Sequence, residues 1–157
     1  MKNVILSVIN DLSTDQRVHK VASTLSKLGY KVTLVGRVYR GSLPLDKRAY
    51  NTKRMFLLFR KGPFFYLEFQ IRLFLYLLFH KSNVLVANDL DTLLPNYLIS
   101  RLKSSNLVYD SHELFCEVPE LQNNPTKKKN LETIRKMDIP KIKNHFYCER
   151  IYRKDLR

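Results

Sequence analysis

Short apolar runs that alternate with helix-like stretches are the feature that most constrains the fold of this chain. The first run spans 2–9 and the second 31–36, each about as long as one strand. A strand without polar alternation is typical of a parallel sheet covered on both faces. Further runs lie at 84–87 and 107–110, and 54–59 is a plausible third strand. The pattern predicts an α/β domain with a doubly wound parallel sheet.

The segments between these runs carry helix signals. Ser13 stands three residues before Gln16, which is the spacing of a capping box, and Gly29 is placed to end the helix that begins there. Two more helices are predicted at 64–80 and 92–103. Strand and helix thus alternate with short connections, as in a single Rossmann-like domain.

The chain is predicted to have two unequal parts. Residues 1–125 hold the alternating pattern and form the predicted Rossmann-like domain. Residues 126–157 are predicted to be a basic tail, irregular or helical, with a basic helix at 127–137 and a short strand at 143–147. The tail lacks the caps of a finished domain, so we expect the chain to be truncated before a further domain.

Charge narrows the choice of partners. The 157 residues carry a formal net charge of +14, and the basic residues gather at 37–81 and 127–157. Such a surface suits an anionic membrane leaflet or nucleic acid, although a solvated basic face is an equal alternative. No RNA-binding signature, zinc-ligand spacing or helix-turn-helix pattern is present, so we expect no nucleic acid partner.

The cellular compartment is predicted from three observations. The chain begins without a signal peptide, and its two cysteines, Cys116 and Cys148, have no disulfide-framework spacing. The apolar stretch 64–79 is too short to span a bilayer and contains Glu68 and Arg72, which can pair on one helix face. We therefore expect a cytoplasmic protein, with a core helix at 64–79 whose flanking basic residues contact lipid headgroups.

Two similar polar turns follow strands that should be neighbours. Asn10-Asp11-Leu12 follows the first strand, and Asn88-Asp89-Leu90 follows the fourth. In a doubly wound sheet these strands lie side by side where the strand order reverses, and ligands bind beyond their carboxyl ends. The fifth strand adds the polar segment 110–113. The sequence predicts that three polar turns converge on one cleft.

The residue types in these turns favour a hydroxyl-rich ligand. The chain has four glycines, and none follows the first strand, so a glycine-rich dinucleotide cradle is absent. Carboxylates accept hydrogen bonds, and carboxamides both donate and accept them, which suits a sugar. Asp89-Leu90-Asp91 has the form of a metal-binding D-x-D string, but Asp91 is placed as a helix N-cap. We therefore predict no metal and no cofactor.

Two further residues near the cleft have open interpretations. Arg17 lies in the first turn of a helix, where a cation opposes the helix dipole, so it should pair with Asp11, Asp15 or a bound anion unless it is simply exposed. His112 could act as a general base or donate a hydrogen bond to a substrate. The alternative is a histidine that only satisfies its neighbours.

Three ordered motifs carry a family resemblance. NDLSTDQRVHK at 10–20, ANDLDTLLP at 87–95 and VYDSHELF at 108–115, continued by EVPEL at 117–121, resemble the amino-terminal domain of family 4 glycosyltransferases. The resemblance implies a GT-B fold of two facing Rossmann-like domains and retaining transfer without a required metal. The first domain receives the acceptor, and the second binds the nucleotide sugar through two glutamates separated by seven residues. No two glutamates of this chain have that spacing.

Site residues follow from the resemblance by position. His112 and Asp15 match catalytic positions. The matches to substrate-binding positions are Asp11, Arg17, Asn88, Asp89 and Glu113. On this basis the chain is expected to supply the acceptor side of the cleft and to be inactive alone, because the nucleotide-sugar domain is missing.

The function implied is that of a retaining glycosyltransferase of the hexosyltransferase type. It would transfer a sugar from a nucleotide sugar to a glycan or lipid-linked acceptor in cell-surface polysaccharide or lipopolysaccharide synthesis, at the cytosolic face of the inner membrane. The main alternative is a non-catalytic basic α/β module that binds a membrane surface or nucleic acid. A decayed gene product that does not fold stably is a third possibility.

Overall fold

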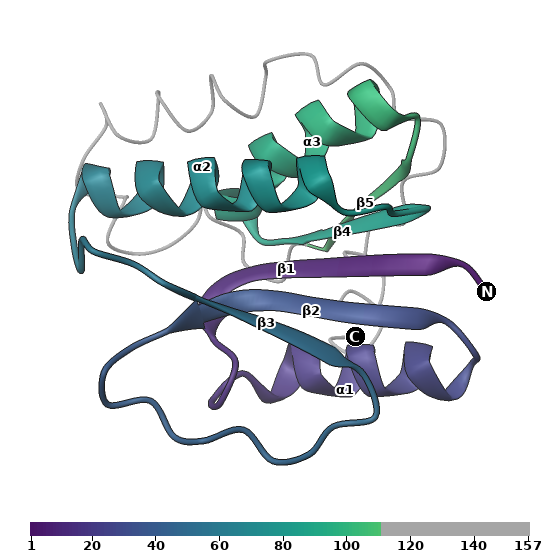
Figure 1. The fold of residues 1–157 in the computed structure, drawn as a ribbon, viewed down its shortest axis with the longest axis horizontal. Coiled ribbons are helices and arrows are strands. Elements are labelled where there is room, and N and C mark those ends of the chain that lie inside the picture. Colours follow the sequence, from purple (N-terminus) through teal and green to yellow (C-terminus); the bar gives the residue numbers. More distant parts are fainter. Residues whose placement is uncertain (111–157) are drawn as a thin grey trace, which may run out of the picture.

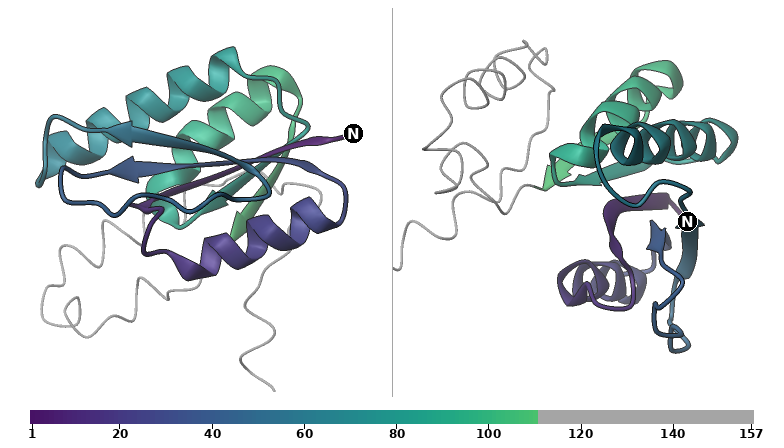
Figure 2. Two further views of the ribbon diagram at one scale, coloured as in Figure 1. Left: turned by 60° about the horizontal axis from the view of Figure 1, so that its bottom comes forward. Right: turned by 90° about the vertical axis from the view of Figure 1, so that its left-hand side faces the viewer.

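The computed structural model describes residues 1–110, which form three layers (Figure 1). A parallel sheet lies between one helix on one face and two helices on the other, and Figure 2 shows the layers from two further directions. The elements in chain order are β1 (Asn3–Asp11), α1 (Gln16–Lys27), β2 (Lys31–Val38), β3 (Asn51–Phe56), α2 (Pro63–Phe79), β4 (Val84–Asn88), α3 (Leu90–Lys103) and β5 (Asn106–Asp110).

The strand order is β3-β2-β1-β4-β5, and every pair is parallel. The order reverses between β1 and β4, which are directly hydrogen-bonded neighbours with Ser7 opposite Ala87. The predicted doubly wound α/β fold is confirmed, and so is the side-by-side placement of the first and fourth strands. All five strands therefore end at one rim, where ligands bind in sheets of this kind.

A separate hydrophobic core lies on each face of the sheet. Under α1 the core includes Val18 and Ala22 of the helix together with Leu6 and Leu34 of the strands. Under α2 and α3 it is larger and includes Phe69 and other wholly buried side chains. Burial on both faces explains why the central strands are nearly continuous apolar runs.

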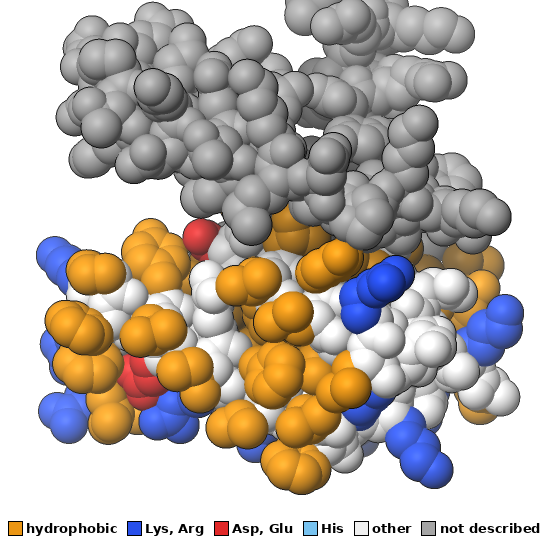
Figure 3. Space-filling model, turned by 90° about the horizontal axis from the view of Figure 1, so that it is seen from above, with side chains coloured by type: hydrophobic (Ala, Val, Ile, Leu, Met, Phe, Trp, Pro, Cys, Tyr) orange, Lys and Arg blue, Asp and Glu red, His pale blue; other side chains and the backbone are white. Residues whose placement is uncertain are grey.

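Helix α2 confirms the predicted core helix and adds an apolar outer face. Its buried side chains, four residues apart, are Phe65, Phe69, Leu73 and Leu77. Its outward side chains are also apolar, and Figure 3 shows hydrophobic side chains spread over this face of the molecule, with Lys and Arg at the margins. The exposed apolar residues on α2 and α3 are Phe64, Leu67, Ile71, Leu75, Phe79, Leu94, Leu98 and Leu102. We call this set the apolar face.

One polar pair interrupts α2. The predicted pairing of Glu68 with Arg72 is confirmed, with 2.8 Å between Glu68 Oε1 and Arg72 Nε. The same carboxylate accepts hydrogen bonds from the backbone N–H groups of Leu58 and Phe59. Burial raises the pKa of Glu68, but these hydrogen bonds and Arg72 outweigh it, so the pKa lies below its usual value. Within residues 1–110, no helix has both the length and the apolarity needed to cross a membrane.

Three local predictions were wrong, namely the cap of α1, the bounds of β3 and the cap of α3. Helix α1 is capped by Asp15, whose Oδ1 accepts from the N–H of Val18 at 3.1 Å, and not by Ser13. Ser13 instead donates to Asp11 through both its backbone N–H and its hydroxyl. A carboxylate is a strong capping group, and Asp15 stands directly before the first helical residue.

The third strand begins earlier than predicted. It covers Asn51–Phe56 rather than 54–59, and its first three residues are exposed and polar. Edge strands need no apolar run because one of their sides faces solvent. The predicted N-cap Asp91 lies in the first turn of α3, which begins after Asp89. The predicted boundary at 125 and the elements of the tail at 126–157 lie outside the described residues.

Candidate functional site

Arg17 connects three chain segments at the carboxyl rim of the sheet. Its Nη2 lies 3.1 Å from Asp89 Oδ2, and its Nη1 lies 3.4 Å from Asp110 Oδ2. The backbone N–H of Asp89 also donates to the carbonyl of Asp110 at 3.0 Å. Arg17, after β1, is thus in contact with the residue that follows β4 and with the last residue of β5, whereas the rest of the predicted segment 110–113 lies outside the described residues. The predicted partners of Arg17 were wrong, because its guanidinium points toward β4 and β5 rather than toward Asp11 or Asp15.

Asn88 is the wholly buried part of this rim. Its Nδ2 donates to the carbonyl of Ser7 at 3.1 Å, and Asn96 of α3 donates to the hydroxyl of the same serine at 2.6 Å. These bonds fix the start of α3 against β1. Within residues 1–110, the side-chain oxygens of Asn88 and Asn96 accept no hydrogen bond. Both are therefore acceptors with unused capacity.

The backbone at Asp89 is unusual. Its φ is 69° and its ψ is 164°, a combination that residues other than glycine rarely adopt. The residue is buried, with 6% of its surface exposed, yet its carboxylate reaches Arg17. A buried carboxylate on a backbone of this conformation is held in one orientation by the surrounding structure.

Asp11 belongs to a second cluster that faces β2 and β3. Its Oδ1 lies 3.1 Å from Arg54 Nη2, and its Oδ2 accepts a hydrogen bond from Ser42. Burial raises the pKa of Asp11, but the hydrogen bonds from Ser13 and Ser42 and the charge of Arg54 outweigh it. The net pKa is therefore below its usual value. Asp11 is thus an ionised residue at the same rim that is already engaged by protein groups.

The other predicted residues have the following places. Asp15 caps α1 and accepts a hydrogen bond from Asn10 at 3.1 Å, so it has a structural role, while its catalytic role stays a prediction. His112 and Glu113 lie outside the described residues. Within residues 1–110, no group of three or more His, Cys, Asp and Glu side chains is arranged to hold a metal ion.

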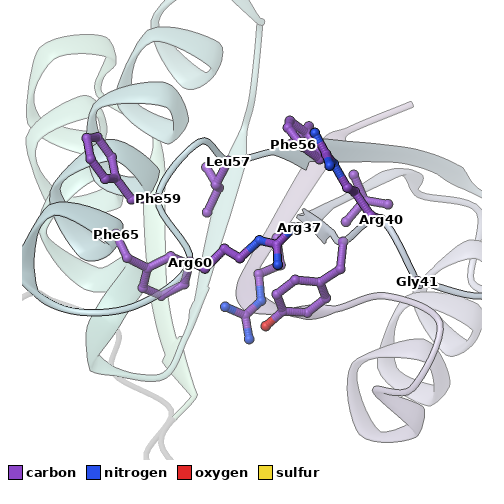
Figure 4. Close-up of a pocket in the computed structure, with 10 residues that line it drawn as sticks. Arg37, Arg40, Gly41, Phe56, Leu57, Phe59, Arg60 and Phe65 are labelled. Carbon is purple, nitrogen blue, oxygen red and sulfur yellow. The ribbon is translucent and has the colours of Figure 1, made fainter.

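A pocket on the same rim was missed by the sequence analysis. It has a volume of about 140 Å³ and lies at the carboxyl ends of β2 and β3, lined by arginine and aromatic side chains (Figure 4). Its residues come from two segments, 37–41 and 56–60, and from Phe65 of α2. The available signal was the group of arginines directly after two strands, within the basic stretch 37–81.

Comparison with known proteins shows similarity of fold alone. No protein-family model matches the chain, and no curated protein sequence matches it significantly. The structure of MurG from Acinetobacter baumannii aligns with a TM-score of 0.50 and 14% identity, over 73% of this chain and 36% of MurG. Sucrose-phosphate synthase from Thermosynechococcus elongatus aligns with a TM-score of 0.55 and 13% identity, over 85% of this chain and 40% of that enzyme.

Both solved structures are GT-B glycosyltransferases. The chain spans less than half of the length of either one. The five-stranded parallel sheet, its strand order and these alignments together show that residues 1–110 have the Rossmann-like α/β fold found in GT-B glycosyltransferases.

Proposed function

We propose that this domain is the acceptor side of a retaining glycosyltransferase that transfers a sugar from a nucleotide sugar to a glycan or lipid-linked acceptor. The observation that carries the proposal is the cluster of Arg17, Asp89 and Asp110 at the switch point of the sheet. The crevice beyond that point is where open α/β sheets bind ligands. The reaction would serve cell-surface polysaccharide or lipopolysaccharide synthesis.

The chemistry of the rim suits an acceptor with several hydroxyl groups. Arg17 offers donors, and the carboxylates of Asp89 and Asp110 accept. These three groups, from α1 and the ends of β4 and β5, can orient a sugar ring so that one hydroxyl points at the donor. The predicted catalytic roles of Asp15 and His112 belong to this proposal.

The nucleotide-sugar side of the reaction is assigned to residues outside 1–110. The two glycosyltransferase structures extend well beyond the aligned domain, since 60% or more of each lies outside it. A glycine-rich phosphate cradle is also absent from the rim, because none of the four glycines follows β1. The proposal therefore includes transfer only when a donor-binding domain is present.

The acceptor role can be tested on a glycan array. The wild-type chain should bind a subset of saccharides, and Asp89→Asn should reduce that binding at least about tenfold, because it removes a charge-assisted hydrogen bond. Asp46→Asn is the matched control, since Asp46 is exposed on the loop before β3. Equal binding by the wild type and Asp89→Asn would contradict the proposed site.

The donor assignment has its own test. Calorimetric titration of the chain with UDP-glucose and GDP-mannose should show no binding in the micromolar range. Binding of either nucleotide sugar at micromolar concentration would place a donor site in this chain and overturn the division of labour proposed here.

The apolar face supports membrane contact as a second element of the function. Exposed basic residues lie next to it in the chain, with Arg60 and Lys61 directly before α2 and Arg101 within α3. Apolar groups with flanking cations bind the interface of an anionic bilayer without crossing it. We therefore propose peripheral binding at the cytosolic face of the membrane where the acceptor is made.

Vesicle sedimentation tests the membrane proposal. The chain should sediment with phosphatidylglycerol vesicles more strongly than with phosphatidylcholine vesicles, and Leu67→Glu should weaken that binding because it places a carboxylate in the apolar face. Leu28→Glu is the matched control, because Leu28 is 68% exposed at the end of α1 on the opposite side of the sheet. Equal effects of the two substitutions would mean that the apolar face does not contact lipid.

The alternative function, a non-catalytic basic module that binds nucleic acid, can be tested by measuring the affinity for RNA and DNA. If the net charge of +14 served nucleic acid binding, the affinity for RNA or DNA would be nanomolar and would fall steeply with salt. We expect neither. Nanomolar, steeply salt-dependent binding together with a blank glycan array would favour the alternative.

A further inference from the structure

The arginine-lined pocket lies beside the proposed acceptor site on the same rim. Arg37 is placed opposite Asp11 in the pairing of β1 with β2, so the pocket begins where the Asp11 cluster ends. Figure 4 shows Arg37 and Arg60 extending into the pocket, with Phe59 and Phe65 on one side and Phe56 and Arg40 on the other. None of these residues takes part in the Arg17 cluster.

Arg37 is held by aromatic rings. Its guanidinium carbon lies 4.2 Å from the centroid of the Tyr39 ring and 4.9 Å from that of the Phe65 ring. Its Nε is buried and has no hydrogen-bond partner within residues 1–110. Burial lowers the pKa of Arg37, while the negative charges of Asp11 and Asp91 oppose that shift. The guanidinium is thus positioned by its ring contacts, and its donors retain capacity for a ligand.

The three arginines of the pocket differ in exposure, because Arg37 is half-buried whereas Arg40 and Arg60 are exposed. Within residues 1–110, the ion pairs involve Arg17, Arg54 and Arg72, and none involves Arg37, Arg40 or Arg60. Three cations that line one small pocket repel one another. A bound anion would remove that repulsion and accept several charge-assisted hydrogen bonds.

The walls of the pocket are apolar. Phe56 and Phe59 both line the pocket, and they are 47% and 50% exposed. Exposed aromatic rings next to arginine donors suit an anion that is attached to an apolar group rather than a free ion. The volume of about 140 Å³ corresponds to roughly five water volumes, enough for the five heavy atoms of a phosphate group.

We infer that this pocket binds the phosphate of an organic phosphate ester, with Arg37, Arg40 and Arg60 as donors and the organic part lying on Phe56 and Phe59. The pocket would then be a second ligand-binding site on the rim, next to the Arg17 cluster that is proposed to bind the hydroxyl groups of the acceptor. That the phosphate belongs to the acceptor rests on the proposed function. Phosphate binding itself does not depend on it.

Calorimetry with three soluble probes tests the inference. Octyl phosphate, inorganic phosphate and neutral octyl glucoside are titrated separately, below any micelle-forming concentration. Octyl phosphate should bind at least about tenfold more tightly than either of the others, because it alone supplies both the charge and the apolar contact. The ester assignment would be overturned if inorganic phosphate bound as tightly as octyl phosphate. It would also be overturned if octyl glucoside bound as tightly as octyl phosphate.

Substitutions locate the binding. Arg37→Gln should weaken octyl phosphate binding about tenfold or more, because it removes a charged donor from the centre of the pocket. Arg60→Gln, at an exposed position before α2, should also weaken it and does not endanger folding. Arg101→Gln is the control, since it removes the same charge from an exposed position on α3. A loss with Arg101→Gln equal to that with Arg60→Gln would show only general charge attraction and overturn the pocket.

Two vesicle arms identify the source of the ester. Vesicles of phosphatidylcholine are prepared with and without phosphatidic acid. Binding that requires phosphatidic acid, is lost in Arg37→Gln and is kept in Arg101→Gln would assign the ester to a membrane lipid. Binding of octyl phosphate alone, with no response to phosphatidic acid, would assign it to a soluble phosphate ester. Failure of every phosphate probe, with saccharide binding on the array retained, would overturn the pocket and leave the proposed function intact.

Discussion

The two Asn-Asp-Leu turns are alike in sequence and unlike in structure. Asn10 is exposed and donates to Asp15 at 3.1 Å, whereas Asn88 is wholly buried and donates to the carbonyl of Ser7 at 3.1 Å. Their aspartates also differ. Asp11 is bound by serines and Arg54 on the side of β2 and β3, and Asp89 is bound by Arg17 on the side of β4 and β5.

The register of the sheet explains the difference. Ser7 is opposite Ala87, so Asn88 is level with Val8 and not with Asn10. Strand β1 continues through an irregularity to Asp11, which carries its turn further beyond the sheet than the turn of β4. A repeated tripeptide therefore predicts the rim on which two turns lie, but not the depth of each turn. Depth decides whether the polar groups stabilise the fold or remain available to a ligand.

The largest expected effect comes from placing a charge at the deeper turn. Asn88→Asp puts a carboxylate against the carbonyl oxygen of Ser7 in a wholly buried position. It should lower the free energy of unfolding at pH 7 by about 3–5 kcal/mol, as an uncompensated buried charge does. The exposed Asn10→Asp should cost less than about 1 kcal/mol. Urea unfolding monitored by circular dichroism measures both, and similar losses would contradict the difference in depth.

The pH dependence of Asn88→Asp checks the cause. Burial raises the pKa of the new carboxyl in the folded state above its pKa in the unfolded chain. The loss of unfolding free energy therefore grows as the pH rises from the unfolded-state pKa to the folded-state pKa. As the pH falls through that raised pKa, the lost stability should return, and it should be nearly complete near pH 4. A penalty that stayed constant from pH 7 to pH 4 would mean that lost packing, and not charge, is responsible.

The next effect tests the irregular end of β1. A Cβ on Gly36 would lie 2.8 Å from Leu12 Cγ and 3.0 Å from the carbonyl oxygen of Asn10, so the first turn would have to move. Gly36→Ala should therefore cost about 1–3 kcal/mol of unfolding free energy, as overpacking does. Gly41→Ala is the control, because a Cβ there meets nothing within 4 Å. Equal melting temperatures for the two variants would contradict the close approach.

A smaller effect on the free energy of unfolding is expected from substitution of Arg17 or Arg54. Arg17→Gln leaves both Asp89 and Asp110 without their cation, whereas Arg54→Gln leaves Asp11 with hydrogen bonds from Ser13 and Ser42. We expect about 1–2 kcal/mol for Arg17→Gln and about 1 kcal/mol or less for Arg54→Gln, since these pairs are partly exposed. Chemical denaturation at low and high salt measures both, and a larger loss for Arg54→Gln would reverse the comparison.

The smallest expected effect concerns acid stability at the first turn. The folded-state pKa of Asp11 is lowered from 3.8, so its ionised form contributes stability that is fully present above that value. The contribution is lost as the pH falls through the folded-state pKa. The stability difference between the wild type and Asp11→Asn should therefore shrink below about pH 3.8. A difference that grew with acid would contradict the lowered pKa.

The strand order was predictable because buried parallel strands are apolar throughout and the first and fourth of them meet in the usual doubly wound order. The start of β3 was not, since Asn51, Thr52 and Lys53 lie in an edge strand that buries little. The cap of α1 was misjudged because Ser13 and Asp15 both fit a helix start, and only the geometry shows that Ser13 is turned toward Asp11.

The sequence predicted the rim on which Arg17, Asp89 and Asp110 lie, but not which of these side chains pair. Arg17 was predicted to need a partner, but its partners lie 72 and 93 residues along the chain, beyond the reach of local spacing rules. The pocket is a meeting of two strand ends and one helix, and Phe65 reads in the sequence as an ordinary core residue. The roles of His112 and Glu113 stay predictions, because these residues lie outside the described part of the chain.

Helix α2 has a consequence for how the domain reaches a single native state. A helix that is apolar on all sides can be rotated about its axis without much change in the hydrophobic area that it buries. The carboxylate of Glu68 breaks that near-equivalence, because it fits only where the N–H groups of Leu58 and Phe59 can be bound. One acidic side chain thus selects the azimuth of the helix, and with it which aromatic residues form the core and which stay outside.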